Sequence, residues 1–241
     1  ENNPVYYTAT DSITLEDPKP RDAYNFAGWY SDAKCTKRVY SVKAGTDGDL
    51  KFYAKWTPKQ VYGIDVSYYQ NRATKNALGR DIDWNAVKAD GIGFAMVRIS
   101  DGKTLDESFV DNYTNARKAG IKVGIYCYNR ATNVKEAVEQ ANFVLDRLNG
   151  RTLDYPICLD MEGNKAALGA TLNTDVVYAF KNVIENAGYD FILYANLDWL
   201  KYGGFDSDRL DSLEIWLARW RDFDRGPDYD SGGNLRMWQY S

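Results

Sequence analysis

One stretch of the chain decides the fold: Tyr155-Pro156-Ile157-Cys158-Leu159-Asp160-Met161-Glu162. Its apolar run ends on two acids, a pattern typical of a strand that reaches the edge of a sheet. Because successive side chains of a strand alternate, Asp160 and Glu162 share one face while Leu159 and Met161 share the other. The Cα atoms of the two acids then lie roughly 6.6 Å apart. The residues alone leave a second interpretation open, in which both acids are solvated at an ordinary strand end.

From Val61 onward, short apolar runs alternate with segments of moderate helical length. This order predicts a parallel α/β sheet of barrel-like form. Strands are expected at 62–67, 94–99, 122–128, 157–160, 191–195, 214–220 and 235–240. Helices are expected at 83–91, 106–119, 134–148 and 175–187, the last with Thr174 as its cap. No helix is expected within residues 221–234, which are rich in Asp, Gly and Pro. The pattern is therefore five βα units followed by bare strands.

The first 58 residues differ from the rest in pattern. Short alternating segments at 5–8, 13–15, 24–30 and 50–56 are separated by prolines and glycines, which predicts a small β-rich unit. Residues 57–60 are short and polar, so the boundary is placed there. The expected domains are residues 1–58 and residues 59–241.

The composition excludes several classes of site. The net charge of the 241 residues is −4 and the basic residues are scattered, so no nucleic-acid surface is expected. The chain has no His, which removes His-activated nucleophiles and the commonest transition-metal ligand. Its cysteines Cys35, Cys127 and Cys158 form no disulfide framework and no CxxC pair. We expect no metal and no cofactor, and we predict that Cys127, facing outward, and Cys158, facing inward, are free and buried thiols.

Candidate catalytic residues are the acids that close strands, because active sites of parallel α/β barrels lie at the carboxyl ends of strands. Asp65, Asp160 and Glu162 meet this condition. Asp65 lies between Ile64 and Val66, so its neighbours can face helices while it points inward, although a capping or solvated Asp is equally compatible. Carboxyl groups crowded in a cleft repel each other, so one stays protonated and can donate its proton. The spacing of Asp160 and Glu162 is in the range for glycosidic acid/base chemistry, and we expect Glu162 to be the donor, since it reaches furthest from the strand.

Several ordered motifs resemble a known family. They are Tyr62-Gly63-Ile64-Asp65-Val66-Ser67-Tyr68-Tyr69-Gln70, Ile82-Asp83-Trp84, Phe94-Ala95-Met96-Val97-Arg98, Gly124-Ile125-Tyr126, Leu159-Asp160-Met161-Glu162 and Trp238-Gln239-Tyr240-Ser241. Together they are similar to glycoside hydrolase family 25, whose members are lysozymes. The resemblance spans residues 61–241 and implies a modified (β/α)5(β)3 TIM-like barrel, here without its last strand.

The resemblance also implies an activity, namely cleavage of the β-1,4 bond between N-acetylmuramic acid and N-acetylglucosamine in peptidoglycan. By matching position, Glu162 corresponds to the general acid, Asp160 to the partner that assists the substrate acetamido group, and Asp65 to the site acid of the first strand. A covalent intermediate and a substrate-assisted route both remain open, and the family favours the second.

Aromatic and basic residues supply candidates for substrate binding. Tyr126 has inward parity and could contact a developing positive charge, or it could be a packed barrel tyrosine. Arg98 shares inward parity with Met96 and Ser100, and either balances the acids or touches sugar. Candidates for sugar-stacking walls, each of which could instead belong to the core, are Tyr69, Tyr194, Trp216, Trp220 and Trp238.

Two departures from the family pattern bear on activity. Members often carry His after the first strand and near the end of the third, where this chain has Tyr68-Tyr69 and Cys127-Tyr128-Asn129. Members usually continue from Trp-Gln-Tyr-Ser into a short strand with a further site Asp, whereas this sequence stops at Ser241.

A second resemblance covers the N-terminal unit. The sequences of residues 24–32 and 49–56 resemble the Listeria–Bacteroides repeat of Gram-positive surface proteins. This resemblance implies a β-grasp-like module that spaces or presents its neighbour, without catalysis of its own.

The leading hypothesis is therefore a secreted or cell-surface muramidase of a Gram-positive bacterium. We expect it to act on peptidoglycan strands as a monomer, without nucleic acid. No apolar run approaches the roughly 18 residues of a membrane span, and residues 1–4 are not a signal peptide. A catalytically weak, surface-displayed peptidoglycan-binding module is the rival, favoured by the missing strand. An unrelated glycosidase acting on another 2-acetamido polymer, such as chitin, is a further alternative.

Overall fold

The structure, a computed structural model, describes residues 3–21, 24–71, 81–163, 168–229 and 232–241. The chain forms two units, Glu1–Val61 and Tyr62–Ser241, and each is described by itself. No helix among the described residues is long and apolar enough to cross a membrane.

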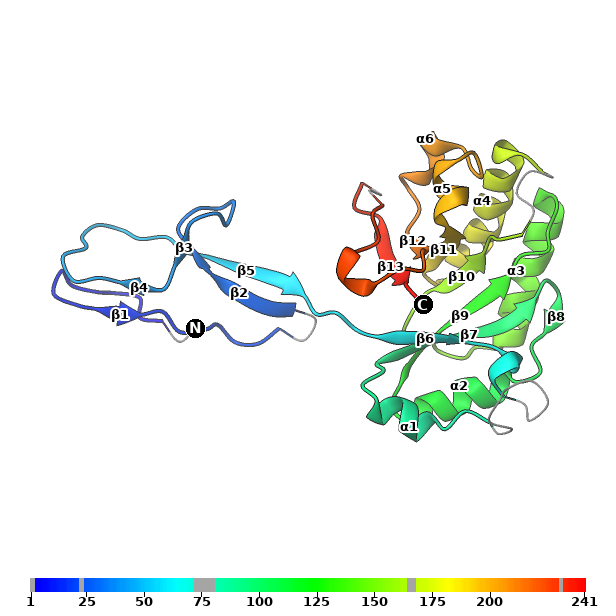
Figure 1. Cartoon of the computed structure of the whole chain (residues 1–241), viewed down its shortest axis with the longest axis horizontal. Coiled ribbons are helices and arrows are strands. Elements are labelled where there is room, and N and C mark those ends of the chain that lie inside the picture. Colours follow the sequence, from blue (N-terminus) through cyan, green and yellow to red (C-terminus); the bar gives the residue numbers. More distant parts are fainter. Residues whose placement is uncertain (1–2, 22–23, 72–80, 164–167, 230–231) are drawn as a thin grey trace. The chain divides into compact units, whose positions relative to one another are not determined.

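The N-terminal unit is built from strands in its described residues (Figure 1). Strand β2, Tyr24–Tyr30, lies between β3, Arg38–Val39, and β5, Tyr53–Pro58, in an antiparallel sheet. Strands β1, Ile13–Thr14, and β4, Ser41–Val42, form a separate antiparallel pair. The expected strand at 24–30 is confirmed, and the one at 50–56 begins and ends later, as β5.

The strand expected at 5–8 is wrong, because this segment turns instead. The backbone N–H of Thr8 donates to Asp11 Oδ2 over 2.7 Å, and the N–H of Asp11 donates back to the Thr8 carbonyl over 3.0 Å. These local bonds compete with a sheet ladder for the same backbone groups. An alternating pattern alone does not show that competition.

The second unit contains one curled sheet with seven parallel strands, in the order β13-β12-β11-β10-β9-β7-β6. Their bounds are β6 Gly63–Val66, β7 Phe94–Asp101, β9 Lys122–Tyr128, β10 Ile157–Asp160, β11 Phe191–Asn196, β12 Ile215–Ala218 and β13 Leu235–Gln239. A short strand, β8, Thr104–Leu105, pairs antiparallel with β7. The two edge strands approach each other where Gln239 Nε2 donates to Asp65 Oδ2 over 2.9 Å. The sheet therefore curls into a barrel-like form.

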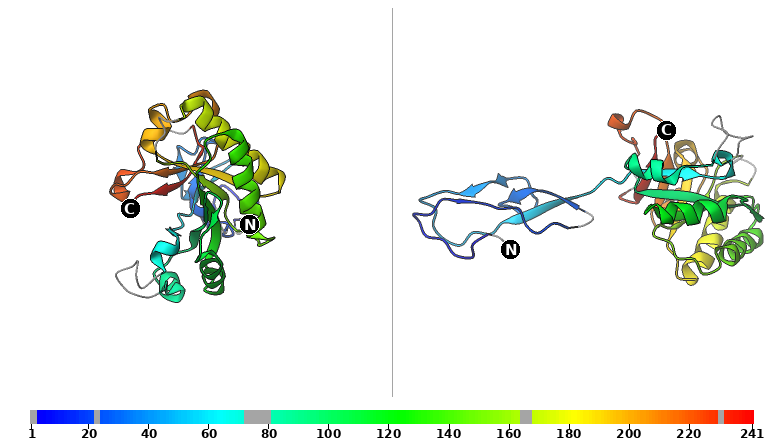
Figure 2. Two further views of the ribbon diagram at one scale, coloured as in Figure 1. Left: turned by 90° about the vertical axis from the view of Figure 1, so that its right-hand side faces the viewer. Right: turned by 90° about the horizontal axis from the view of Figure 1, so that it is seen from below.

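Helices cover the outer face of this sheet (Figures 1 and 2). They are α1 Trp84–Ala89, α2 Phe109–Lys118, α3 Val134–Leu148, α4 Ala170–Asn186, α5 Leu197–Lys201 and α6 Ser207–Leu210. The predicted alternation of strands and helices from β6 to β11 is confirmed, although the short α5 and α6 that follow β11 had not been anticipated. Between β12 and β13 the described residues contain only a 3-10 turn, Phe223–Arg225, as expected for that Asp/Gly/Pro-rich segment.

Local sequence signals explain most of the helix ends. Asp83 caps α1 by accepting from the N–H groups of Asn85 and Ala86, as the sequence predicts. The prediction that Thr174 caps this helix is wrong, since α4 already begins at Ala170. Thr174 is buried inside the helix, where its hydroxyl donates to the Ala170 carbonyl over 2.8 Å and accepts from the Asp206 N–H over 2.9 Å.

Two apolar clusters lie on opposite faces of the curled sheet. Residues such as Val97, Ile125 and Leu159 join the large cluster under the helices. The smaller inner cluster consists of Met96, Cys158, Ile192, Tyr194, Trp216 and Ala218. Gly124 leaves room for this filling, because a Cβ atom there would lie 2.6 Å from the sulfur of Met96. Since side chains fill the inside of the sheet, a site is expected at an edge, and in parallel α/β barrels that edge is the carboxyl one.

Candidate functional site

The carboxyl edge of the sheet gathers the three predicted acids. Asp65 lies on β6, Asp160 is the last residue of β10, and Glu162 follows two residues later. The three are near enough that the charges of Asp65 and Glu162 raise the pKa of Asp160, and the charge of Asp65 raises that of Glu162. Strand alternation thus brings together acids that lie far apart in the sequence.

Asp160 is the most buried of these acids, with 6% of its surface exposed. Burial is the main reason that its pKa lies well above the usual value, followed by the charges of Glu162 and Asp65, while Arg98 acts in the opposite direction. Its Oδ1 atom is buried and accepts no hydrogen bond from the described residues. Buried acceptors without a donor are rare in folded proteins. This oxygen is therefore able to receive an N–H or O–H group from a bound molecule.

Asp65 is held by a network that the sequence did not reveal. Burial raises its pKa, and the hydrogen bond from Gln239 lowers it in part. The Oε1 atom of Gln239 accepts from the Tyr194 hydroxyl over 2.9 Å and from Trp220 Nε1 over 3.0 Å. These two bonds fix the Gln239 amide so that its N–H group faces Asp65. The only sequence signal was the position of Gln239 within the Trp238-Gln239-Tyr240-Ser241 motif.

Glu162 is the exposed member of the acid group. Partial burial raises its pKa first, and the charge of Asp65 raises it further. Burial and the charge of Glu162 also raise the pKa of Tyr128. A carboxyl group that keeps its proton and still reaches solvent is able to donate to a molecule in the opening.

Tyr126, Tyr194 and Trp216 form the floor beneath the acids. Burial raises the pKa of both tyrosines, helped most by the charge of Asp65 for Tyr126 and of Asp160 for Tyr194. The Trp216 ring packs edge-on against both of them, with centroid distances of 6.5 Å to Tyr126 and 4.8 Å to Tyr194. The inward parity predicted for Tyr126 is confirmed by its place in the inner cluster.

The remaining aromatic candidates take different positions. Trp220 is 75% exposed and reaches the acids through Gln239. Trp238 pairs with Leu217 of the outer cluster, and its ring stacks on Phe223 at 5.5 Å, so it is not brought among the acids. Tyr69 is exposed and lies 5.5 Å from the guanidinium of Arg98.

Arg98 is buried, with 8% of its surface exposed, and it is anchored by Asp106. Its Nε donates to Asp106 Oδ2 over 2.8 Å, and the N–H of Tyr68 donates to the same oxygen over 3.1 Å. Burial lowers the pKa of Arg98, but the bond to Asp106 and its charge outweigh this and raise it. Asp106 precedes α2, where the sequence predicted helix, and its role was missed.

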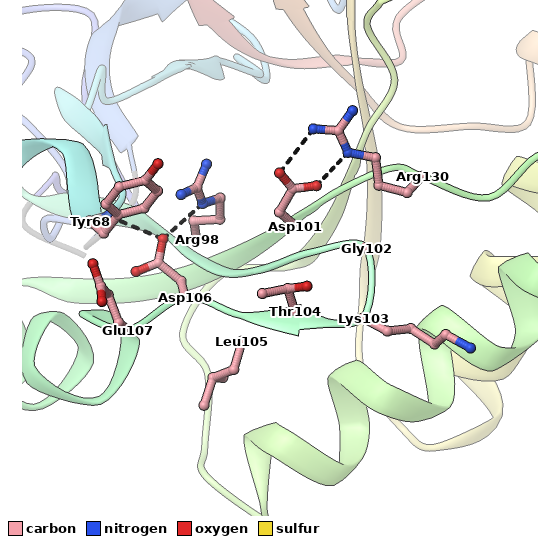
Figure 3. Close-up of a pocket in the computed structure, with 10 residues that line it drawn as sticks. All are labelled: Tyr68, Arg98, Asp101, Gly102, Lys103, Thr104, Leu105, Asp106, Glu107 and Arg130. Atoms are coloured by element: carbon pink, nitrogen blue, oxygen red, sulfur yellow. Dashed lines mark hydrogen bonds and ion pairs between the residues drawn. The ribbon is translucent and has the colours of Figure 1, made fainter.

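A pocket of about 650 Å³ opens beside Arg98 (Figure 3). Its rim carries Asp101 and Arg130, joined by two hydrogen bonds of 2.5 and 3.0 Å. Arg130 also lies 4.5 Å above the ring of Tyr128. Asp65, Asp160 and Glu162 do not line this pocket, which lies along the β7–β8 hairpin.

A bulge in β7 corrects one parity assignment. Arg98 pairs with Tyr126, whereas Ser100 pairs with Cys127, so the ladder gains a residue between them. Ser100 therefore lies on the side of Cys127, to which its hydroxyl donates over 3.2 Å, and not on the side of Arg98. Both Cys127 and Cys158 are buried and free, as predicted. Burial raises the pKa of the Cys127 thiol to about 12, so it is no nucleophile.

Comparisons with known proteins find matches to most of the second unit. The model of glycosyl hydrolases family 25 matches residues 64–241. Lysozyme M1 of Streptomyces globisporus is 30% identical over 195 residues, which cover 75% of this chain and 62% of that protein. The autolytic lysozyme of Clostridium acetobutylicum is 29% identical over 146 residues, covering 58% of this chain and 41% of that protein. The chain thus spans less than two thirds of either relative.

Solved structures give the same picture of the fold. The bacterial lysozyme from Streptomyces coelicolor superposes with a TM-score of 0.62 at 26% identity, over 76% of this chain and 84% of that one. A family 25 glycosyl hydrolase from Bacillus anthracis superposes with a TM-score of 0.59 at 22% identity, over 76% and 79%. The α/β barrel-like fold of residues 62–241 is therefore shared with both.

Proposed function

The chain belongs to glycosyl hydrolases family 25, and from this we propose that it is a muramidase. It cleaves the β-1,4 bond between N-acetylmuramic acid and N-acetylglucosamine in peptidoglycan. Glu162 is the general acid, Asp160 assists the acetamido group of the substrate, and Asp65 completes the acid group. Both curated relatives carry the name lysozyme, which supports this reaction class.

The observation that carries the proposal is the unsatisfied Oδ1 atom of Asp160. A buried carboxyl oxygen without a donor is costly, and a substrate N–H group would remove that cost on binding. A 2-acetamido sugar offers such an N–H next to the carbon at which the glycosidic bond breaks. A hydroxyl at that position could also donate to Asp160, but only the acetamido group adds an oxygen that can bond to the anomeric carbon.

Substrate binding also explains how the proton comes to reside on Glu162. In coupled groups the protons belong to the cluster, and in the free protein the most buried member, Asp160, holds one most tightly. A substrate N–H that donates to Asp160 favours its charged form. That charge then repels a charge on Glu162 and keeps Glu162 protonated at the exposed edge of the site.

The reaction that follows uses the substrate's own acetamido oxygen. Glu162 gives its proton to the glycosidic oxygen as the bond to the anomeric carbon breaks. The acetamido oxygen bonds to that carbon, and negatively charged Asp160 stabilises the resulting oxazolinium ring. Water then attacks the same carbon, the bond from that carbon to the acetamido oxygen breaks and restores the acetamido group, and the water gives a proton to Glu162, which restores the acid. Tyr126 beneath the acids contacts the positive charge, and Tyr69, Tyr194, Arg98, Trp216 and Trp238 stay proposed as substrate-binding residues.

The N-terminal unit and the location form a second part of the proposal. We infer that residues 1–58 are a Listeria–Bacteroides-type, β-grasp-like repeat that presents the hydrolase of residues 59–241. The motifs at 24–32 and 49–56 support this, as does a build of strands in the described residues. Such a module fits a secreted or cell-surface protein that acts as a monomer on peptidoglycan.

A clearing assay on purified peptidoglycan tests the proposal. The unchanged chain should clear the suspension and leave muramic acid at the new reducing ends, while Glu162→Gln should bind without clearing. Glu185→Gln, at an exposed carboxylate paired with Lys181, is the matched control and should clear normally. Binding without clearing by both the unchanged chain and the control would favour a binding module. Release of N-acetylglucosamine ends, or digestion of chitin alone, would assign another bond.

A further inference from the structure

One face of the sheet β3-β2-β5 collects cations and tyrosines. Arg38 lies directly opposite Tyr30, and Tyr30 lies opposite Tyr53 on the other side, so these side chains share a face. Lys55 follows Tyr53 by two residues and joins them. We call this set, with Tyr40 and Lys51, the cationic face.

Each cation of this face lies near a tyrosine ring. Lys55 Nζ is 5.4 Å from the Tyr30 ring, and Lys51 Nζ is 5.2 Å from the Tyr53 ring. The Arg38 guanidinium is 5.0 Å from the Tyr40 ring. All three cations are exposed, and across the ranges that the structure describes none of them forms an ion pair with a carboxylate. Their charge is therefore available to an outside partner.

Arg38 is placed by the glycine beside it. A Cβ atom at Gly28 would lie 2.7 Å from Arg38 Nε and 3.0 Å from its Cζ. The missing side chain lets the guanidinium lie across the middle strand. Gly28 also has φ +123°, a backbone conformation that other residues rarely adopt.

The opposite face of the same sheet has a different role. Phe26 packs edge-on against Trp29 and Trp56, each at 5.4 Å, and the three rings are half-buried. The cations of the cationic face are exposed, on a chain whose net charge is −4. Local charge of the opposite sign to the whole chain points to a specific anionic partner.

We propose that the cationic face binds an anionic wall polymer built of repeated phosphodiesters. Arg38 and Lys55 come from the strands on either side of β2, and the Arg38 guanidinium lies over Gly28, the residue opposite Lys55. With Lys51 before β5, the face presents three cations in succession, which a chain of repeated phosphates can contact together. The guanidinium fork matches a phosphate, and the tyrosine rings offer surfaces to the polyol or sugar between phosphates. Only the wall location is taken from the proposed function, since binding here requires no hydrolysis.

Co-sedimentation of the full chain with cell walls tests this site. Walls are used intact and after hydrofluoric acid has removed the phosphodiester polymers, and Glu162→Gln in all proteins prevents digestion. The chain should bind intact walls at least 10-fold better than stripped walls. Arg38→Gln with Lys51→Gln and Lys55→Gln should remove most of that difference. The control, Lys34→Gln with Lys43→Gln and Lys59→Gln, changes the charge equally at exposed residues outside the three strands and should keep it.

Two further measurements keep the test decisive. Thermal unfolding should show that both triple variants remain folded. Soluble glycerol-phosphate polymer should displace the chain from intact walls. Equal binding to intact and stripped walls would overturn the proposal while leaving the muramidase proposal standing. An equal loss in the control variant would overturn it too, because net charge alone would then explain the binding.

Discussion

The two units of this chain each place uncompensated charge on one face of a sheet, with opposite sign and opposite exposure. In the barrel-like unit the inner face ends in Asp65, Asp160 and Glu162. Burial raises the pKa of all three, and the charge of neighbouring carboxylates raises it further for Asp160 and Glu162. In the N-terminal unit the cationic face carries Arg38 and Lys55 in solvent. Burial raises the pKa of an acid so that it can hold and transfer a proton, whereas an exposed cation stays charged and can attract an anion.

The difference shows why one sheet suits catalysis and the other binding. Burial and repulsion raise the pKa of Asp160 and of Glu162, which favours a proton within the acid group that can be transferred. The exposed cations repel each other weakly through water and remain charged together. The predictions below test this contrast, first at the buried acids and last at the exposed cations.

Asp160→Asn should have the largest effect. Replacing the charged partner of the acetamido group with a neutral amide should lower kcat by about 100-fold to 1000-fold, with little change in KM. Reducing-end release from peptidoglycan measures both constants. Exposed Asp146→Asn serves as the control, and a kcat within about 2-fold of the unchanged chain for Asp160→Asn would remove Asp160 from the mechanism.

Relative to the unchanged chain, Asp160→Asn should become more stable as the pH rises. Because burial raises the pKa of Asp160, its neutral form adds stability below the unfolded pKa, and that stability is lost as the pH rises through the folded pKa. Asn does not ionise, so Asp160→Asn should unfold at a higher temperature than the unchanged chain once the pH exceeds the usual Asp pKa of about 4, and the difference should grow toward neutral pH. A constant difference from pH 4 to pH 8 would contradict a raised pKa at this site.

Arg98 and Asp106 give the opposite case, a buried charge with its partner. Asp106→Ala should cost about 3 kcal/mol of unfolding free energy, because Arg98 would stay buried without its carboxylate. Asp101→Ala removes an exposed partner of Arg130 and should cost less than about 1 kcal/mol. Urea unfolding of both variants checks this order, and equal losses would show that burial does not separate the two pairs.

Much of the fold followed from strand alternation and helix-ending signals. Strands β9 and β10 and helix α3 lie where the sequence predicted them, because each is a clean periodic run between turn residues. The start of α4 was missed because Thr174 is a typical capping residue, whereas the helix already begins at Ala170. The bulge at Ile99 was missed because it depends on the partner strand, and it reversed the face of Ser100.

The candidate site was predictable only in part. Asp65, Asp160 and Glu162 could be placed on one edge because strand parity is a local property. Gln239 and Asp106 could not be assigned roles, because each acts through a contact that joins distant segments. The Gln239 contact spans 174 positions in the sequence, and the Arg98–Asp106 contact depends on how the β8 hairpin folds back. A sequence pattern predicts on which face of a strand a residue lies, but not which distant residue it contacts.

Gln239 therefore offers a test of how Asp65 is positioned. Gln239→Ala should lower kcat by about 10-fold, since Asp65 loses the bond that orients it. Gln239→Glu places a second carboxyl beside Asp65, so the pKa of Asp65 should rise. The acidic limb of the pH–rate profile should then shift to higher pH. Arg236→Gln, exposed on the same strand, is the control. An unmoved profile for Gln239→Glu would mean that Asp65 does not influence the reacting acids.

The smallest effect is expected from salt, and it separates the two units most directly. Raising NaCl from about 50 to 300 mM shortens the screening length to about 6 Å, so attraction to the exposed cations should weaken several-fold. Asp160 is buried and the proposed proton donor Glu162 acts in its neutral form, so hydrolysis of soluble peptidoglycan fragments should change by less than about 2-fold. Sedimentation with intact walls and reducing-end release from fragments measure the two responses on the same protein. A parallel loss in both assays would place the salt-sensitive step in the catalytic unit, and the contrast between exposed and buried charge would then fail.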